Sequence, residues 1–385
     1  MTLTSGALDP QTLMDRAELA AGADDWGHPP FRGALDILCD SARRDTDLTA
    51  AGQAALTARI LAAGVRRLKV YADRKRHPEI AGQKIARPLV LTGLPRSGAG
   101  VLHALLAQDP AARSPLNWEL ADPSPPPRAE TFATDPRIAR AEAAAQRLDP
   151  DFRALHPVGA LLPEECGAIT AMAFQTLNFR AAANLPSYMR WLLTVSDAMP
   201  AYVLHKHVLQ HLQAFAPGKW WCLQSPQHLF WLDRLMETYP DARVVMVHRD
   251  PAAALPANAA LVAVLRRGSG RDDPKAVGAE EVGAWGQGVR RALAYRESGA
   301  CAGQFFDCQH DDFVREPLET VEAIYEYFDL TLTDEARGRM TAFMAGRRQA
   351  AHGKRVYSPE QFGLDAKTLR REFGEYIETL NIPTD

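Results

Sequence analysis

Long apolar segments and an excess of positive charge are both missing from this 385-residue chain. No apolar run approaches the roughly 20 residues that cross a bilayer, and residues 1–25 lack the basic-then-apolar order of a signal peptide. Lys and Arg number 44 against 47 Asp and Glu, a net charge of −3, which argues against a nucleic-acid partner. We therefore expect a soluble, cytoplasmic, globular protein that acts on a small molecule, with no membrane partner.

Cysteine pairs and metal-ligand clusters are also missing. The five cysteines are odd in number and show no C-x-x-C spacing, which argues against a disulfide framework and a cysteine zinc site. His207 and His211 are four residues apart on an expected helix, residues 199–215, but no further ligands accompany them. We expect buried thiols, a partly buried helix face and no metal.

The most informative stretch runs from Pro88 to Gln108. Leu89 to Thr92 predict a short buried strand, Gly93 to Gly98 a tight loop, and Val101 to Leu106 a helix. Backbone N–H groups of such a loop and the positive end of the helix dipole favour a phosphate or sulfate. An ordinary glycine turn between strand and helix is the alternative.

The same loop lacks two residues that nucleotide hydrolysis requires. Ala99 stands where the phosphate loop of nucleotide hydrolases has lysine, and Gly100 stands where it has the magnesium-binding Ser or Thr. The basic residue comes earlier, at Arg96. The pattern therefore argues against ATP or GTP hydrolysis.

Further strands alternate with helices along the chain. Strands are expected at residues 220–224, 242–248 and 304–308, and the helices between them predict a three-layer α/β fold with a mainly parallel sheet. Arg96, Ser225 and Arg249 each follow a strand, at the edge where such sheets bind ligands, so one anion can meet all three. Residues 1–84 read as an N-terminal helical extension, and residues 85–385 as the α/β domain.

The segment between the first two strands holds candidate acid–base groups. A proline-rich loop at residues 123–127 precedes a helix at 135–147 and then His156, which is either a hydrogen-bonded loop histidine or a catalytic one. Glu164 and Glu165 open a long expected helix at 166–179, where they serve either as dipole-favoured capping residues or as site residues.

The last part of the chain is expected to be helical around one basic loop. Helices are expected at residues 230–238, 252–267, 280–297, 312–328 and 365–380. The intervening loop at 346–357 carries Lys354 and Arg355, and it is either a lid on an anionic ligand or a plain solvated loop.

Five motifs, taken in order, resemble the bacterial branch of the sulfotransferase family, and the likeness runs from Pro88 to the C-terminus. They are Leu94-Pro95-Arg96-Ser97-Gly98; Leu155-His156-Pro157 with Pro163-Glu164-Glu165-Cys166; Ser225-Pro226-Gln227-His228-Leu229; Pro240-Asp241-Ala242-Arg243-Val244-Val245 with His248-Arg249-Asp250-Pro251; and Tyr357 with Gln361-Phe362-Gly363-Leu364-Asp365.

The resemblance implies a P-loop-like α/β fold and 3′-phosphoadenosine 5′-phosphosulfate (PAPS) as the sulfuryl donor. It gives the 5′-phosphosulfate to Arg96, Ser97 and Gly98, and the 3′-phosphate to Arg249. The donor-binding set expected from the loop, the strand ends and the basic tail is Arg96, Ser97, Gly98, Ala99, Gly100, Ser225, Arg249, Lys354 and Arg355.

Several positions depart from the family pattern. The loop has Ala99 and Gly100 in place of hydroxyl residues, Gln224 replaces a lysine, Ala257 replaces the serine that shares the 3′-phosphate, and His310 replaces a tyrosine. If each lost contact was a hydrogen bond of about 1 to 3 kcal/mol, donor affinity falls by several orders of magnitude.

Three functions are consistent with these motifs. The first is sulfuryl transfer from PAPS to a hydroxyl or amine of a small metabolite, with His156 as base, Glu165 or Glu164 as its orienter or substitute, and Arg96 stabilising the leaving phosphate. The second is a repurposed enzyme that catalyses an acid–base rearrangement, elimination or cyclisation in a biosynthetic pathway without PAPS. The third is an inactive structural or regulatory homologue.

Overall fold

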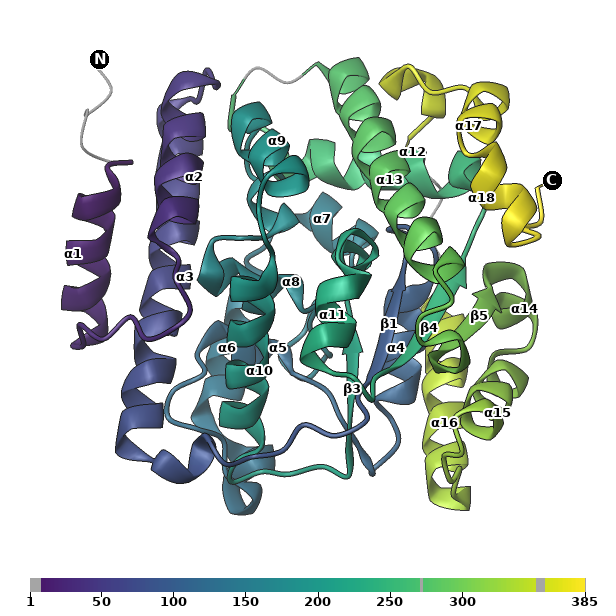
Figure 1. Cartoon of the computed structure of the whole chain (residues 1–385), viewed down its shortest axis with the longest axis horizontal. Helices are drawn as coiled ribbons and strands as arrows, with labels where there is room; N and C mark the ends of the chain where they lie inside the picture. The colour runs from purple at the N-terminus through teal and green to yellow at the C-terminus, as the bar shows by residue number, and fades with distance from the viewer. Residues whose placement is uncertain (1–7, 271–272, 351–356, 385) are drawn as a thin grey trace. The chain divides into compact units, whose positions relative to one another are not determined.

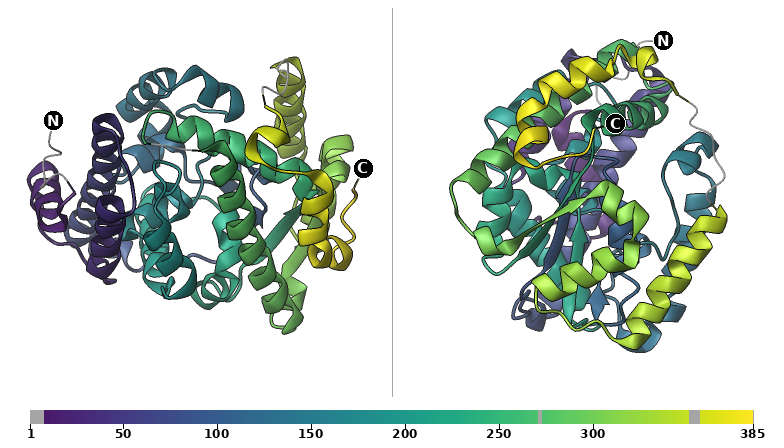
Figure 2. Two further views of the ribbon diagram at one scale, coloured as in Figure 1. Left: turned by 90° about the horizontal axis from the view of Figure 1, so that it is seen from above. Right: turned by 90° about the vertical axis from the view of Figure 1, so that its right-hand side faces the viewer.

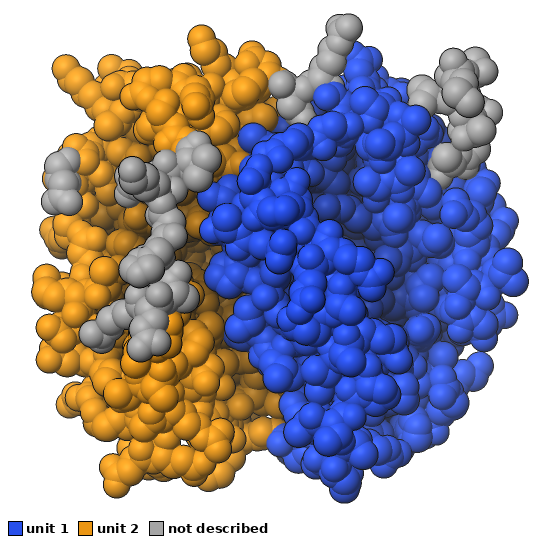
Figure 3. All heavy atoms as spheres, turned by 180° about the vertical axis from the view of Figure 1, so that it is seen from behind, with its two compact units in different colours: residues 1–84, 115–217, 262–272 blue, residues 85–114, 218–261, 273–385 orange. Residues whose placement is uncertain are grey.

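The computed structural model of the chain describes residues 8–270, 273–350 and 357–384, with residues 348–350 described by their backbone alone. The chain divides into two compact units, which Figure 3 shows in different colours. Unit 1 contains residues 1–84, 115–217 and 262–272, and unit 2 contains residues 85–114, 218–261 and 273–385. The expected division into an N-terminal helical extension, residues 1–84, and a single α/β domain, residues 85–385, stays a prediction.

Unit 2 is built on a five-stranded sheet in which all neighbouring strands are parallel. The strands are β1 (Leu89–Gly93), β2 (Ala112–Arg113), β3 (Trp220–Gln224), β4 (Arg243–His248) and β5 (Phe305–Gln309), and their order is β2-β3-β1-β4-β5. In the register, Val90 lies beside Leu223 on one side and Val244 on the other. The parallel α/β fold expected from the alternating pattern is confirmed.

Helices cover both faces of the sheet because successive strand residues point to opposite sides. Leu91 and Val245 on one face join a core with side chains of α4 (Ala99–Leu106), α15 (Pro317–Tyr327) and α16 (Asp334–Ala350). On the other face lies α13 (Pro274–Glu297) (Figure 1). It contacts the sheet through Tyr295, whose ring lies 6.3 Å from that of Phe305.

The C-terminal helices of unit 2 pack near the ends of the strands. Figure 2 shows them beside α13, which α18 contacts. The remaining helices of this unit are η5 (Pro226–Phe230), α11 (Leu232–Thr238), η6 (Ala302–Gln304), α14 (His310–Arg315), η7 (Pro359–Phe362), α17 (Ala366–Glu372) and α18 (Gly374–Thr379). Helix α12 (Pro251–Arg266) begins in unit 2, and its residues from 262 onward belong to unit 1.

The named elements of unit 1 are all helices among its described residues. Its first three helices, α1 (Pro10–Ala21), α2 (Arg32–Arg44) and α3 (Ala50–Arg76), confirm the helices expected before the first strand. The others are η1 (Pro78–Ile80), α5 (Asn117–Ala121), η2 (Ala129–Thr134), α6 (Pro136–Gln146), α7 (Pro150–Leu155), α8 (Gly167–Thr170), η3 (Ala171–Ala173), η4 (Leu177–Phe179), α9 (Pro186–Thr194) and α10 (Met199–Gln213).

Four expected elements are wrong in detail. The helix at 166–179 is three short pieces, α8, η3 and η4, because Phe174 adopts a left-handed φ of 56°. The helix at 312–328 is interrupted before Pro317, and the helix at 365–380 is divided into α17 and α18. Residues 346–350 continue α16 instead of beginning a loop, and residues 351–356 lie outside the described part of the chain.

The five cysteines are free thiols. Cys39, Cys166, Cys222 and Cys308 are buried thiols, and Cys301 is half-buried. Among the helices in the described ranges, none combines the length and apolar character of a membrane span. The described residues also contain no group of His, Cys, Asp and Glu suited to a metal ion.

Candidate functional site

The loop after β1 has the geometry of an anion-binding turn. Its closing N–H, from Ser97, donates to the Leu94 carbonyl at 3.1 Å, and Gly98 caps the first turn of α4. Arg96 takes a left-handed φ of 64°, uncommon for a residue other than glycine. Such a turn directs its backbone N–H groups to one side, where the positive end of α4 also lies.

Both glycines of the loop are required by their surroundings. Gly93 has a φ of 146°, and a Cβ there would collide with the carbonyl oxygen of Val247 on β4. Gly98 has a φ of 101°, and a Cβ there would lie 2.9 Å from Nδ1 of His310. The loop therefore lies directly against β4 and against the residue that follows β5.

Two side chains from neighbouring strand ends anchor the loop. Arg249, which follows β4, donates from Nη1 to the carbonyl of Arg96 at 2.6 Å. His310, which follows β5, is 2.8 Å from the carbonyl of Ser97 through Nδ1. Burial, together with the positive charge of Arg249, lowers the pKa of His310, so the neutral ring donates from Nδ1 to that carbonyl.

A buried hydroxyl in the loop is unpaired. Ser97 is fully buried, and its Oγ has no hydrogen-bond partner among the described residues. Since buried polar atoms normally have partners, this oxygen is a group of the loop whose hydrogen bond a ligand could complete. The hydroxyl suits a ligand with anionic oxygens, such as PAPS, because a serine hydroxyl donates a hydrogen bond to a phosphate or sulfate oxygen.

Ser225 lies at the same sheet edge. Its N–H donates to the carbonyl of Leu91 at 3.1 Å, and its carbonyl accepts from Thr92 Oγ1 at 3.0 Å. The end of β3 is thereby joined to the end of β1. Gln224, just before it, is buried, and its Oε1 has no partner among the described residues. Because Gln224 stands where the family pattern has a lysine, this strand end carries a neutral amide.

A cavity of about 290 Å³ lies beside Arg249 and His310, within unit 2. Arg370 of α17 and the acids Asp250 and Asp311 add to its charged lining, and Ala253 contributes part of its apolar surface. The cavity brings the arginine after β4 and the imidazole after β5 together, next to the loop that both of them hold. The sequence predicted only the arginine.

The other positions considered for PAPS binding lie in α4, in α12 and outside the described residues. Ala99 is buried and Gly100 is exposed, both in the first turn of α4, where N–H groups have no acceptor within the helix. Their contribution to an anion site is therefore the backbone. Ala257 is buried on α12 and carries no hydroxyl. Lys354 and Arg355 lie outside the described residues, so the expected basic lid is untested.

The three candidate acid–base residues belong to unit 1, whereas the loop, Ser225 and Arg249 belong to unit 2. His156 is half-buried at the end of α7, and its ring stacks on Phe152 with 5.4 Å between centroids. Glu164 and Glu165 precede α8, whose N-cap is Cys166 and whose first turn contains no acidic residue. No side-chain hydrogen bond caps α8 at Cys166, and the choice between a dipole-favoured and a site role for the two glutamates stays a prediction.

Glu164 is a half-buried carboxyl group held by two hydrogen bonds. Burial raises its pKa, against the opposing effects of the Glu165 N–H and the charge of Arg66. Its Oε1 accepts from that N–H at 3.0 Å, and its Oε2 accepts from Nδ2 of Asn117 at 3.0 Å. Asn117 was missed from the sequence because an amide at a helix start gives no sequence signal of its own.

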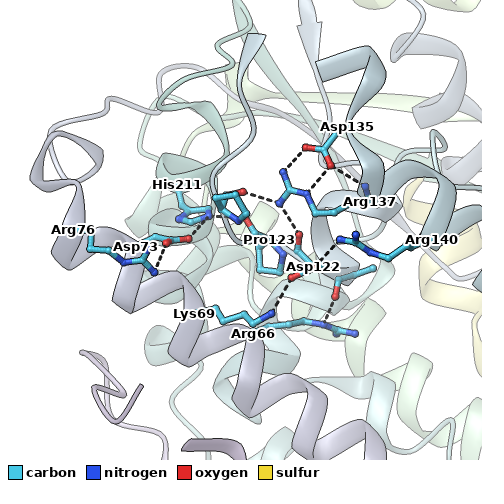
Figure 4. A network of polar contacts seen from close by, with 12 residues as sticks. Arg66, Lys69, Asp73, Arg76, Asp122, Pro123, Asp135, Arg137, Arg140 and His211 are labelled. Carbon is cyan, nitrogen blue, oxygen red and sulfur yellow. Dashed lines mark hydrogen bonds and ion pairs between the residues drawn. The ribbon is translucent and has the colours of Figure 1, made fainter. Parts of the chain in front are cut away.

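The proline-rich loop at 123–127 is fixed by side chains of three helices of unit 1 (Figure 4). Arg137 of α6 donates to the carbonyls of Asp122 and Pro125, and His211 of α10 lies 2.9 Å from the carbonyl of Pro123 through Nε2. Lys69 of α3 pairs with the carboxylate of Asp122 at 3.2 Å. The expectation that His211 lies on a buried helix face is confirmed.

Comparison with known proteins supplies the family. Residues 88–334 match the model of the sulfotransferase family. The crystal structure of sulfotransferase STF9 from Mycobacterium avium aligns with a TM-score of 0.90 at 29% identity over 99% of each chain. Sulfotransferase STF1 from Mycobacterium tuberculosis H37Rv aligns with a TM-score of 0.84 at 31% identity, covering 95% of this chain and 98% of that one. No curated protein matches the chain.

Proposed function

We propose, given that the chain belongs to the sulfotransferase family, that it transfers a sulfuryl group from PAPS to a hydroxyl or amine of a small-molecule metabolite. Family and fold make the chain a sulfotransferase; the donor, the acceptor class and the residue roles are the proposal. The observation that carries it is the glycine loop with its unpaired Ser97 hydroxyl, held by Arg249 from the neighbouring strand.

Unit 2 would hold the donor by its two anionic ends. Arg96, the Ser97 hydroxyl and the N–H groups at the start of α4 would bind the 5′-phosphosulfate, since a helix N-terminus favours anions. Arg249 would bind the 3′-phosphate from the charged cavity beside the loop. The losses at Ala99 and Gly100 remove side-chain contacts and leave these backbone donors in place.

Catalysis in this scheme is positioning, charge stabilisation and proton removal. PAPS supplies an activated sulfuryl group. The guanidinium of Arg96 stabilises negative charge that collects on the departing phosphate. His156 accepts the proton of the acceptor hydroxyl or amine, and Glu164 or Glu165 orients it or takes its place, in keeping with the raised pKa of Glu164.

The test is a transfer assay followed by mass spectrometry. The chain is incubated with PAPS and a panel of hydroxylated and amine metabolites, and the expected result is a product heavier by one sulfuryl group, formed only when PAPS is present. A His156→Ala variant should lose transfer and keep nucleotide binding, because the substitution lies outside unit 2. Turnover of a metabolite without any donor would overturn the proposal in favour of the repurposed acid–base enzyme.

A further inference from the structure

We infer that Tyr376 is a positioning residue for Arg249, and that His248 and Asp307 fix Tyr376 in the orientation this requires. This inference rests on the proposed function, because it concerns the arginine that would bind the 3′-phosphate. All the residues involved belong to unit 2. One series of hydrogen bonds connects Arg296 of α13 to the backbone of Arg249, and each of its links is described in turn.

The first link is the hydroxyl of Tyr376 on α18. The backbone N–H of Arg249 bonds to this hydroxyl, which is also 3.1 Å from Nδ1 of His248. The ring of Tyr376 meets that of His248 edge-on, with 5.7 Å between the centroids. Both side chains are buried, so the hydroxyl is held from two sides within the protein.

The second link sets the direction of these hydrogen bonds. Nε2 of His248 lies 2.7 Å from Oδ1 of Asp307, and a carboxylate can only accept, so Nε2 carries a proton. With the single ring proton on Nε2, Nδ1 of His248 is an acceptor, and the hydroxyl of Tyr376 donates to it. The lone pairs of the hydroxyl oxygen consequently face the N–H of Arg249.

The third link keeps Asp307 ionised. Arg296 of α13 donates to both carboxylate oxygens, at 2.5 and 2.7 Å. Although burial opposes ionisation, the hydrogen bonds from His248 and Arg296 lower the pKa of Asp307 to about 2. The carboxylate therefore remains an acceptor for His248 throughout the neutral pH range.

A second contact from the C-terminal helices holds the adjacent residue. Arg370 of α17 donates from Nε and Nη2 to Oδ2 of Asp250, at 3.0 and 2.7 Å. Oδ1 of Asp250 accepts the N–H of Ala252 at 2.9 Å, at the start of α12. The turn between β4 and α12 is thus fixed at two successive residues by side chains more than a hundred residues later in the chain.

Arg249 depends on this turn for the placement of its side chain. Arg249 lines the cavity, and its Nη1 donates to the loop carbonyl of Arg96. Small displacements of a charged group lose much of its effect on a bound anion. Freeing the backbone of Arg249 should therefore weaken contacts to the 3′-phosphate more than contacts to the 5′-phosphate, because His310 also holds the loop that would bind the 5′-phosphate.

The test compares two nucleotides by calorimetric titration of the full chain. Adenosine 3′,5′-bisphosphate carries the 3′-phosphate, and adenosine 5′-phosphate lacks it. For Tyr376→Phe we expect bisphosphate binding weakened on the order of tenfold, the equivalent of one hydrogen bond, and adenosine 5′-phosphate binding weakened much less. A merely structural role of the hydroxyl would weaken both nucleotides together.

Two further variants complete the test. Tyr325→Phe is the matched control, since it removes another buried hydroxyl hydrogen bond of unit 2, the one to Asp109, and should change neither affinity. Asp307→Ala alters a side chain that is 37% exposed, so it tests the series of hydrogen bonds even if Tyr376→Phe does not fold. It should reproduce the selective loss in part.

The outcomes separate the two claims. Selective weakening of the bisphosphate in Tyr376→Phe or Asp307→Ala supports the inference. If the unaltered chain binds the bisphosphate and both variants bind it equally well, or if both nucleotides weaken alike, the inference is overturned while the proposed function stands. If the unaltered chain binds neither nucleotide, the proposed function fails first.

Discussion

At the scale of single residues, the candidate PAPS site is defined by the hydrogen bonds that each side chain can donate. Arg249 and His310 donate hydrogen bonds to the loop carbonyls of Arg96 and Ser97, respectively. They therefore hold the loop and also line the cavity. The Ser97 hydroxyl is fully buried and has no partner among the described residues, so its hydrogen-bonding capacity is unused there. A structural hydroxyl and a ligand-binding hydroxyl respond differently to removal.

Ser97→Ala should therefore separate stability from affinity. Removing an unpartnered buried hydroxyl should change the free energy of unfolding by less than about 0.5 kcal/mol, whereas binding of adenosine 3′,5′-bisphosphate should weaken about fivefold. Urea unfolding and calorimetric titration measure the two effects.

Thr92→Val is the matched control for this substitution. The Thr92 hydroxyl donates to the carbonyl of Ser225, so its loss should cost about 1 kcal/mol of stability. A Ser97→Ala protein that is destabilised to the same extent and binds nucleotide normally would show that the Ser97 hydroxyl is structural.

At the scale of elements, the unit formed by β1, the loop and α4 determines the site, and its entry glycine is the most constrained residue. Gly93 combines a φ of 146° with a close approach to the carbonyl of Val247. Both conditions exclude a side chain at this position. The contact between β1 and β4 and the shape of the loop therefore both require that residue 93 has no Cβ.

Gly93→Ala is expected to lower the free energy of unfolding by at least about 2 kcal/mol, from backbone strain and a collision with β4. Gly283→Ala provides the comparison, since Gly283 lies within α13 and a Cβ added there would meet no heavy atom within 4 Å. That change should stabilise the protein by about 0.5 to 1 kcal/mol. Equal stability of Gly93→Ala and the unaltered chain in urea unfolding would contradict the constraint on Gly93.

The elements that the sequence predicted are those with strong local signals. β1, β3, β4 and β5 have short runs of apolar residues ended by polar or proline residues, and the structure confirms all four. β2 was missed because two residues carry no periodicity. The helix at 166–179 was wrong because its apolar spacing gives no sign that Phe174 turns left-handed.

The sequence predicted only those residues of the candidate site that lie within a short sequence motif. The loop and Arg249 were found because a motif surrounds each of them. Tyr376 and Asp307 could not be found, since their roles depend on contacts with His248 from distant parts of the chain. The clue that was present is the histidine directly before Arg249, whose position at the end of a buried strand requires partners for both ring nitrogens.

At the scale of the whole molecule, buried neutral histidines set the acid limit of stability. Burial lowers the pKa of His103 to about 4 and that of His205 to about 3. His103 lies 3.1 Å from the carbonyl of Cys222 through Nε2, which fits the neutral ring as a donor. The unfolded chain takes up these protons near pH 6.5, well before the folded one does.

Stability should therefore fall as the pH drops from about 6.5 toward 4, because the unfolded state binds more protons in that window. Each of these histidines contributes a slope of up to about 1.4 kcal/mol per pH unit. Urea unfolding at several pH values measures it, and His103→Gln should give a shallower slope. A free energy of unfolding that stays constant between pH 7 and 5 would contradict the assignment.

The donor site as a whole is tested by calorimetric titration with adenosine 3′,5′-bisphosphate, using the unaltered chain and Arg249→Ala. We expect saturable binding to one site and, in the variant, affinity weaker by about ten- to a hundredfold, the range for a charge-assisted hydrogen bond. Arg234→Ala, on α11, should bind like the unaltered chain. Failure of the unaltered chain to bind at millimolar nucleotide, or equal binding by Arg249→Ala, would contradict the proposed donor site.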